Sequence, residues 1–490
     1  MSAAATLVLA ACAGTPPPAA EVELPTAIPA AWQAPGATAE AAPAAAAAPL
    51  PERWWTQFGD ARLDACVDAA LQHNQDLAAA AARVLAAHEQ AVIAGAPRLP
   101  QLDASFDAAR SRRVFVGFPF GGGGVPSSTT TTFGLGLNAS WELDVWGRLR
   151  AAEGAALAAV QAEAADFAGA RQSLIAQTCK AYFALVEARQ QRALAEATVT
   201  AFAATAEDVR DRFRRGVRPA LDTMQADGSL QSAQADVARR RQQEQVAARQ
   251  LEVLLGRYPA ARQDSAAVLS TDLPAVPAGL PSELLGRRAD LAAAERRLAA
   301  AGCRVDAARA ALYPRLSLTA SGGTNSEELG DLLDDAFRVW TLGANLLQPL
   351  FHGGALRAEA ARTEAERLQA LFGYGGALLR AFAEVEDALA ASAWLRDQQQ
   401  AAAAAATSAA GARDLARERY QLGLIDFLAV LDGQQRAFTA ESARIAVLRQ
   451  QLDNRVELIL ALGGGFAAQP PRVLPPRAPE PNEPTDGTDS

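Results

Sequence analysis

The chain has 490 residues with 46 basic and 55 acidic side chains, which leaves a net charge of -9. This balance excludes the strongly basic domain that nucleic-acid binding favours, so no nucleic-acid partner is expected. Ala, Leu, Arg, Glu and Gln dominate the composition, and they favour long helices because they lose little side-chain freedom there.

The first residues are typical of a targeting segment. An apolar run over residues 3–11 is closed by Cys12 and followed by Pro and small residues. The run is too short to span a bilayer as a helix, and its end, Leu-Ala-Ala-Cys, resembles a bacterial lipoprotein signal. We predict a signal peptide over 1–11, lipidation at Cys12, and an Ala/Pro-rich linker over 12–51. In such lipoproteins Ala13, in place of Asp, implies export to the outer membrane. The alternative is an apolar disordered end with an incidental cysteine.

The other three cysteines and the three histidines indicate neither a disulfide framework nor a metal site. Cys66, Cys179 and Cys303 lie far apart in helical stretches without C-x-x-C spacing, so we predict small buried apolar residues. The histidines show no ligand spacing either. No metal and no cofactor are expected.

An internal repeat determines the organisation of the chain. The segment DLAAAAARVLAAHEQAVIAGAPRLPQLDAS, from Asp76, aligns with DLAAAERRLAAAGCRVDAARAALYPRLSLTAS, from Asp290. Further on, RFRRG ending at Gly216 corresponds to RYQLG ending at Gly423. The predicted units are a first repeat over 52–265, an inter-repeat linker over 266–287, a second repeat over 288–465 and a disordered Pro-rich acidic tail over 466–490.

Each repeat is predicted to contain one β-hairpin. Apolar and polar residues alternate with period 2 in FGLGLNASWELDVWG, from Phe133 to Gly147, as in a strand with one apolar face. The odd-numbered residues from Phe133 to Val145 share the apolar face. The opposite face, with Asn138, Ser140, Glu142 and Asp144, is predicted to line a lumen. The four predicted strands cover about 101–108, 133–146, 315–321 and 338–350.

Long helices are predicted after each hairpin. From Gly147 to Phe213, and from Gly354 to Tyr420, the sequence offers two equally long helical stretches without proline. Each has about 67 residues, or about 100 Å at 1.5 Å per residue, which is longer than a compact globular domain. After Gly216 and Gly423 a second helix runs back, over 221–255 and 427–462, and a small irregularity is expected at the glycines of 373–376.

The strand count constrains a membrane interpretation. An open four-stranded sheet in lipid would leave unpaired edge groups, and membrane barrels need at least about eight strands. Several copies would therefore have to pool their strands. Trp141 and Trp146 lie where an interfacial aromatic girdle is expected. The alternative is a pair of soluble hairpins packed against helices.

Three segments carry a family resemblance. WWTQFGDARLDACVDAALQHNQDLAAAAARV from Trp54, SWELDVWGRLRAAEGAA from Ser140 and LPAVPAGLPSELLGRRADL from Leu273 resemble the NodT group of outer-membrane efflux lipoproteins, relatives of TolC and OprM. The similarity extends from about Trp54 to about Gly465. One departure is at Ala289, where the family usually has Pro, and it is expected to loosen one turn.

The resemblance implies a mixed α and β membrane protein. In it a homotrimer forms a 12-stranded outer-membrane barrel, four strands from each chain, continuous with a periplasmic helical barrel. The implied function is the exit duct of a tripartite efflux pump, which joins a periplasmic adaptor to an inner-membrane RND-type transporter and conducts small molecules such as drugs. No paired-carboxylate, Ser/His/Asp or phosphate-cradling motif stands out, so the chain is not expected to be an enzyme.

The resemblance also implies functional residues where the helix pairs turn. Gly216 and Gly423 are implied to form the tight turns that the adaptor contacts. Asp432, and Asp222 in the first repeat, match acidic positions that line the constriction of the channel. The basic residue to which Asp222 would latch is replaced by Ile425, and a second acidic position is Ala429. The alternative for both aspartates is an ordinary solvated carboxylate on a helix.

Two other functions remain open at this stage. The same architecture serves as the outer-membrane duct of type I protein secretion, which export genes or a peptide substrate beside this gene would favour. A lipid-anchored helical scaffold that never inserts its strands belongs to a different class. Ion conductance and heat-modifiable migration of an outer-membrane trimer would separate a channel from a scaffold.

Overall fold

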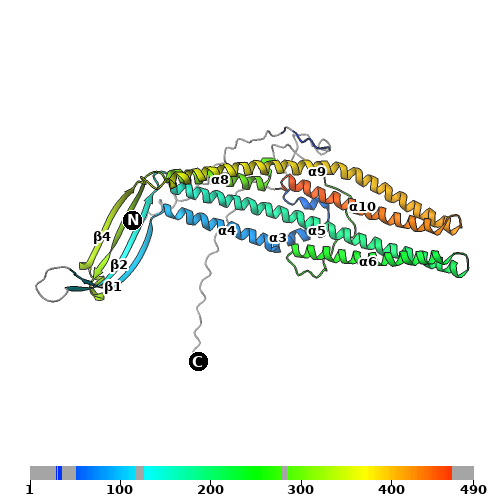
Figure 1. The fold of residues 1–490 in the computed structure, drawn as a ribbon, viewed down its shortest axis with the longest axis horizontal. Coiled ribbons are helices and arrows are strands. Elements are labelled where there is room, and N and C mark those ends of the chain that lie inside the picture. Colours follow the sequence, from blue (N-terminus) through cyan, green and yellow to red (C-terminus); the bar gives the residue numbers. More distant parts are fainter. Residues whose placement is uncertain are drawn as a thin grey trace, which may run out of the picture.

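The computed structural model describes residues 29, 31–35, 51–116, 126–274, 276 and 284–465. A four-stranded sheet forms one end of the molecule, and long helices run from it along the longest axis to two tight turns at the other end (Figure 1). The predicted signal peptide, most of the linker after it, Cys12 and the acidic tail lie outside the described residues.

The sheet is antiparallel, and its strands are in chain order, so β1 and β4 are its two edges. All four strands are found where the alternation predicts them, with different ends. Its members are β1 (Gln101–Val114), β2 (Ser127–Leu143), β3 (Arg315–Ser326) and β4 (Arg338–Leu347).

Three strands extend further than predicted at the end of the sheet far from the helices. The Ser/Thr run over 127–132 precedes the strand predicted over 133–146, yet it pairs with residues 109–114 because β-branched Thr suits a pleated strand. The strand lengths are 14, 17, 12 and 10 residues, and each reaches the 9 to 11 residues of a tilted spanning strand. β2 and β4 stop three residues early, at Leu143 and Leu347; in β4 this is where Gln348-Pro349 ends the ladder.

The two long helices have the predicted length. α5 (Arg148–Arg214) and α9 (Ala355–Gln421) each contain 67 residues, and α6 (Ala220–Leu254) and α10 (Phe427–Ala461) run back with 35 residues each. The equal lengths confirm the two-repeat organisation. α9 continues unbroken through the glycines of 373–376, where an irregularity was predicted.

Shorter helices complete the helical part. In the first repeat α3 (Ala61–His73) and α4 (Gln75–Gly95) precede the sheet, and in the second repeat α7 (Leu284–Arg287) and α8 (Ala289–Ala310) do so. α4 and α6 both pack along α5, whereas α8 and α10 both pack along α9. α5 also contacts α8 and α10, which joins the two repeats.

The largest core lies halfway along the helices. The 3-10 helix η1 (Trp54–Phe58) inserts Trp54 and Trp55, which are 0% and 1% exposed, against the middle of α5 and the C-terminal half of α10. Cys66 and Cys179 are buried there as free thiols, as predicted, and Cys303 is half-buried. Burial raises the pKa of the Cys66 thiol to about 11.

Arg288 begins the second repeat and anchors it. Its guanidinium, on a side chain only 10% exposed, pairs with Asp290 at 2.9 Å and with Glu384 of α9 at 2.7 Å. It also donates to the carbonyl oxygen of Ala461 at the end of α10. The turn before α8, where Ala289 replaces the expected Pro, is therefore held by charge-assisted hydrogen bonds to two other helices.

Candidate functional site

The sheet has one apolar and one polar face. Cross-strand pairs such as Ala139 with Ala320 and Leu318 with Ala344 place even residues of β1, β3 and β4 on the same face as odd residues of β2. Trp340 and Leu342 are 76% and 72% exposed on this face. The apolar face carries Leu102, Ala104, Phe106, Ala108, Phe133, Leu135, Leu137, Ala139, Trp141, Leu316, Leu318, Ala320, Trp340, Leu342, Ala344 and Leu346.

The polar face bears the predicted lumen residues that belong to the strand. Asn138, Ser140 and Glu142 lie on β2, opposite the apolar face. Neighbouring strands add Asp103, Ser105, Thr319, Ser321, Thr341 and Asn345 to the same face. Glu142 pairs with Arg148 at 2.7 Å, at the start of α5.

Asp144, predicted to be a lumen residue of the strand, lies just beyond the end of β2 instead. Its carboxylate accepts hydrogen bonds from the backbone N–H groups of Leu149 and Arg150, at 2.9 and 2.8 Å. These groups have no partner within the helix, and an acidic residue at a helix N-terminus also complements the helix dipole. Asp144 and Gly147, with φ +75°, thus set the direction in which α5 leaves the sheet.

Two tryptophans mark the same boundary. The indole N–H of Trp141 donates to the carbonyl of Arg98 at 2.9 Å, and that of Trp146 to the carbonyl of Pro314 at 2.8 Å. The Trp146 ring stacks on Tyr313, with 5.0 Å between the ring centroids. An apolar ring with a satisfied polar end is the arrangement typical of a membrane interface.

At the other end of the helices, each pair closes through a glycine in the left-handed region. Gly216 has φ +74° and Gly423 has φ +77°. The N–H of the following residue bonds to the carbonyl five residues back in both turns, from Val217 to Arg212 and from Leu424 to Arg419. This is the Schellman arrangement, which satisfies the last helical carbonyls and favours glycine because it has no Cβ.

A tyrosine that the sequence analysis missed fills the space between the two turns. Tyr420, near the end of α9, is 2% exposed, and the guanidinium groups of Arg212 and Arg218 lie 4.9 and 4.8 Å from its ring centroid. Burial raises the pKa of its hydroxyl, and the two arginines oppose the shift. The repeat alignment places Tyr420 against Phe213, which is 45% exposed. The alignment therefore gave no signal that this position is buried.

The two predicted constriction residues occupy different surroundings. Asp222 lies half-buried in the first turn of α6. Asp432 lies on α10, 56% exposed, and pairs with Arg436 at 2.7 Å. Ile425, at the latch position, packs against the apolar cluster around Phe427. None of these residues therefore forms an ion-pair latch within one chain.

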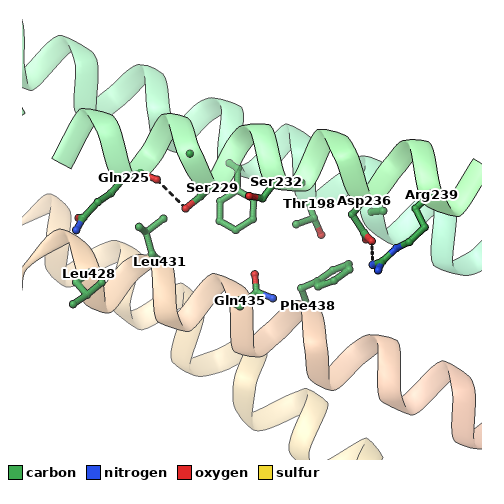
Figure 2. Close-up of a pocket in the computed structure, with 14 residues that line it drawn as sticks. Thr198, Gln225, Ser229, Ser232, Asp236, Arg239, Leu428, Leu431, Gln435 and Phe438 are labelled. Carbon is green, nitrogen blue, oxygen red and sulfur yellow. Dashed lines mark hydrogen bonds and ion pairs between the residues drawn. The ribbon is translucent and has the colours of Figure 1, made fainter. Parts of the chain in front are cut away.

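A groove separates the two helix pairs near the turns (Figure 2). Its volume is about 520 Å³. α6 contributes small and polar residues, among them Gly228, Ser229 and Ser232, whereas α10 contributes Leu428, Leu431 and Phe438. No spacing in the sequence predicts this groove, because its two walls, 225–239 and 428–438, lie far apart in the chain.

A line of polar contacts joins α5 to α10 between the groove and the core. Gln191 and Ser442 share hydrogen bonds, and Arg449 pairs with Glu187 at 2.6 Å. Arg449 also pairs with Asp453. Burial raises the pKa of Asp453 to about 6, although Arg449 and Lys180 act in the opposite direction.

The four-stranded sheet has one apolar face and is joined to two helix pairs, each with one helix of 67 residues. This combination defines the class of outer-membrane channels with a helical extension. The sequence model of the outer membrane efflux protein family matches residues 66–257 and 280–464, one match in each repeat. The chain belongs to this family.

Individual relatives agree with the family assignment. The chain is 35% identical over 469 residues to the pyoverdine export outer membrane protein OpmQ of Pseudomonas putida, covering 95% of this chain and 97% of the relative. It is 32% identical over 422 residues to the cation efflux system protein CusC of Escherichia coli, covering 84% and 88%. Among solved structures, the CmeC outer membrane channel of Campylobacter jejuni superimposes with a TM-score of 0.85 at 26% identity, covering 93% of this chain and 96% of that one.

These matches confirm the predicted fold and the class of function. The chain is an outer-membrane efflux channel that extends into the periplasm, and it is not an enzyme. Family membership sets aside the scaffold alternative and favours efflux over protein secretion. Cys12 lies outside the described residues, so its lipidation remains a prediction.

Proposed function

We propose that three copies of the chain assemble into a closed duct that conducts small molecules out of the cell. The observation that carries the proposal is the sheet, whose edges β1 and β4 are both unpaired. In lipid each unpaired edge group would cost several kcal/mol, so β1 of one copy has to pair with β4 of the next. Three copies supply twelve strands, within the range of membrane barrels.

The helices support the same closure. α5 is enclosed by α4, α6, α8 and α10, whereas in the described part of the chain the long helices packed along α9 are α8 and α10. The side of α9 away from them carries Phe372 and Trp394, 66% and 61% exposed, and α4 carries Ile93 and Leu85, 62% and 59% exposed. Apolar surface of this kind marks an interface. In the trimer α9 of one copy lies against α4 and α6 of its neighbour, so the helices close into a tunnel.

The polar strand face, with Asn138, Ser140 and Glu142, lines the barrel lumen in this assembly. At the far end of the helices the tunnel is narrowest at Asp432 and Asp222, and the trimer places three of each around its axis. A ring of carboxylates attracts cations and repels itself when the end is closed. The ion pair between Asp432 and Arg436 partly offsets the negative charge of this ring, but the three Asp432 carboxylates still face one another.

The partners of the duct are a periplasmic adaptor and an inner-membrane RND-type transporter. The glycine turns at Gly216 and Gly423, together with the groove between α6 and α10, offer the adaptor two tight turns and an apolar wall next to small polar residues. An amphipathic helical hairpin fits such a groove, with its apolar face against Leu428 and Phe438.

The transported compounds are small molecules, because the relatives that share most of the chain carry the names of pyoverdine, solvent and cation exporters. Protein secretion remains the second candidate. Copurification of the tagged chain with an adaptor and an RND-type transporter, followed by susceptibility tests of a deletion strain, checks the proposal. Copurification with a peptide exporter instead would contradict it.

The membrane anchor is proposed at Cys12. Replacing Cys12 by Ala is expected to abolish metabolic labelling with palmitate, while the barrel still inserts. Persistence of the label on C12A would remove Cys12 as the lipidation site.

A further inference from the structure

The apolar face of the sheet ends in arginines at the end far from the helices. Along β1 the residues of this face are Leu102, Ala104, Phe106 and Ala108, and the next two are Arg110 and Arg112. The last apolar pair across β1 and β2 is Ala108 with Phe133, followed by Arg110 with Thr131 and Arg112 with Thr129. The apolar band thus gives way within one pair of residues to guanidinium and hydroxyl groups.

Within the described part of one chain, no carboxylate pairs with either of these two arginines. From residue 108 to residue 132 the sequence contains no Asp or Glu, and among the described residues neither Arg110 nor Arg112 forms an ion pair. Arg112 donates one hydrogen bond, to the Ser127 hydroxyl at 3.1 Å. Arg338, on the same face at the other edge of the sheet, differs because it pairs with Asp335.

The position of the arginines determines what can bind them. The apolar band below faces the acyl chains, so the next residues along the face lie at the depth of the headgroups. Arginine is the side chain best suited to phosphate because its planar group donates two parallel hydrogen bonds. Basic side chains at this depth attract anionic headgroups, by about 1 kcal/mol each.

We propose that Arg110 and Arg112, with the hydroxyls of Thr129 and Thr131, bind a phosphate group of an outer-leaflet lipid. The site takes a phosphate monoester on a glycolipid headgroup, and it rests on the inserted barrel of the proposed trimer. Inorganic phosphate shares the chemistry but lacks the acyl chains, which the apolar band below Arg110 would contact.

The chain offers a matched control on the same strand. Arg113 carries the same charge and is also exposed, but it lies on the opposite, polar face of β1. Replacing it by Gln removes one positive charge per chain from the same hairpin, half of what R110Q/R112Q removes, without touching the lipid side.

The test is native mass spectrometry of the full-length trimer titrated with lipid A that carries both phosphates. R110Q/R112Q is expected to bind it on the order of thirtyfold more weakly than the parent protein, whereas R113Q keeps the parent affinity. Lipid A stripped of phosphate should bind weakly to all three proteins, and an equimolar amount of inorganic phosphate should not displace intact lipid A.

Equal losses in R113Q and R110Q/R112Q, or no loss in either, would overturn the site. Displacement by equimolar inorganic phosphate would show an anion site that does not select lipid. If the R110Q/R112Q trimer dissociates while its lipid affinity is unchanged, the arginines pair with acidic residues of a neighbouring copy and do not bind lipid. The same spectra give the number of chains in the complex. A parent protein that is not trimeric would therefore contradict the proposed assembly, independently of the result for the lipid site.

Discussion

Gln191 on α5 and Ser442 on α10 are joined by two hydrogen bonds across the two repeats. The amide nitrogen of Gln191 donates to the Ser442 carbonyl at 2.9 Å, and the Ser442 hydroxyl donates to the Gln191 side-chain oxygen at 2.7 Å. Gln191 is 3% exposed and Ser442 is half-buried, so the Gln191 amide would be buried without a partner if the Ser442 contact were lost.

Replacing Gln191 by Ala is expected to lower the free energy of unfolding by about 1 kcal/mol, because two hydrogen bonds across the repeats are lost and the half-buried Ser442 hydroxyl loses its partner. Thermal denaturation of the purified protein measures this loss. Thr439→Ala is the control, since Thr439 is exposed and bonds only to its own helix. Equal effects of the two substitutions would show that the contact contributes nothing of its own.

Asp453 gives the helical part a pH dependence. Its pKa rises from 3.8 to about 6, so the folded state binds the proton more tightly than the unfolded state does. The stability that this tighter proton binding contributes is therefore full at pH values below about 4 and is lost as the pH rises through 6.

Asp453→Asn removes the titrating group, so the stability of the variant relative to the parent protein should increase as the pH rises. The difference in unfolding free energy is expected to reach on the order of 2 kcal/mol above pH 6 and to shrink toward pH 4. Denaturation of both proteins between pH 4 and 7 checks this. Parallel stability curves would exclude a raised pKa at Asp453.

The turn at Gly423 depends on its backbone conformation and not on space. Its φ is +77°, and an added Cβ would meet nothing within 4 Å. Gly423→Ala should therefore cost about 1 to 2 kcal/mol of local strain without a clash, and Gly423→Asn should cost less because Asn tolerates this conformation.

Gly411→Ala is the control for that change. Gly411 lies inside α9, where an added Cβ also meets nothing within 4 Å, and Ala favours a helix over Gly by about 1 kcal/mol. The two Ala substitutions should thus shift the melting temperature in opposite directions. A stabilising Gly423→Ala would refute the glycine-specific turn.

Asp432 is the predicted gate residue that conductance tests most simply. Asp432→Ala should raise single-channel conductance in planar bilayers, because removing three carboxylates relieves the narrow ring of bound cations. Asp432→Asn, of nearly equal size, should reproduce the rise if charge is the cause. Asp414→Asn is the control, because Asp414 is an exposed residue of α9. A conductance that is unchanged in Asp432→Ala would remove Asp432 from the gate.

Much of the fold could be predicted from the sequence because its signals are local and repeated. The proline-free stretches gave both long helices to within one residue, and the period-2 alternation gave the four strands. The strand ends were less predictable, since the threonines over 129–132 suit a loop or a strand until a partner is present. Asp144 looked like a strand residue because it continues the alternation, yet it caps the helix that follows.

The contacts between repeats could not be predicted, because no spacing in the sequence relates their members. Tyr420 comes from the second repeat, whereas its two arginines flank the turn of the first repeat. The groove between α6 and α10 likewise exists only after the two helix pairs are placed side by side.

The closure of the sheet between copies is tested most directly by cysteine cross-linking. Asp103 on β1 and Asn345 on β4 lie on the polar face at opposite edges of the sheet. Paired cysteines at these positions, or with position 103 moved to 101 or 105 to scan the register, should oxidise into a covalent trimer in outer membranes. Either single-cysteine parent should give none. The absence of any cross-linked species across the scan, or products larger than three chains, would contradict a barrel closed by β1 of one copy on β4 of the next.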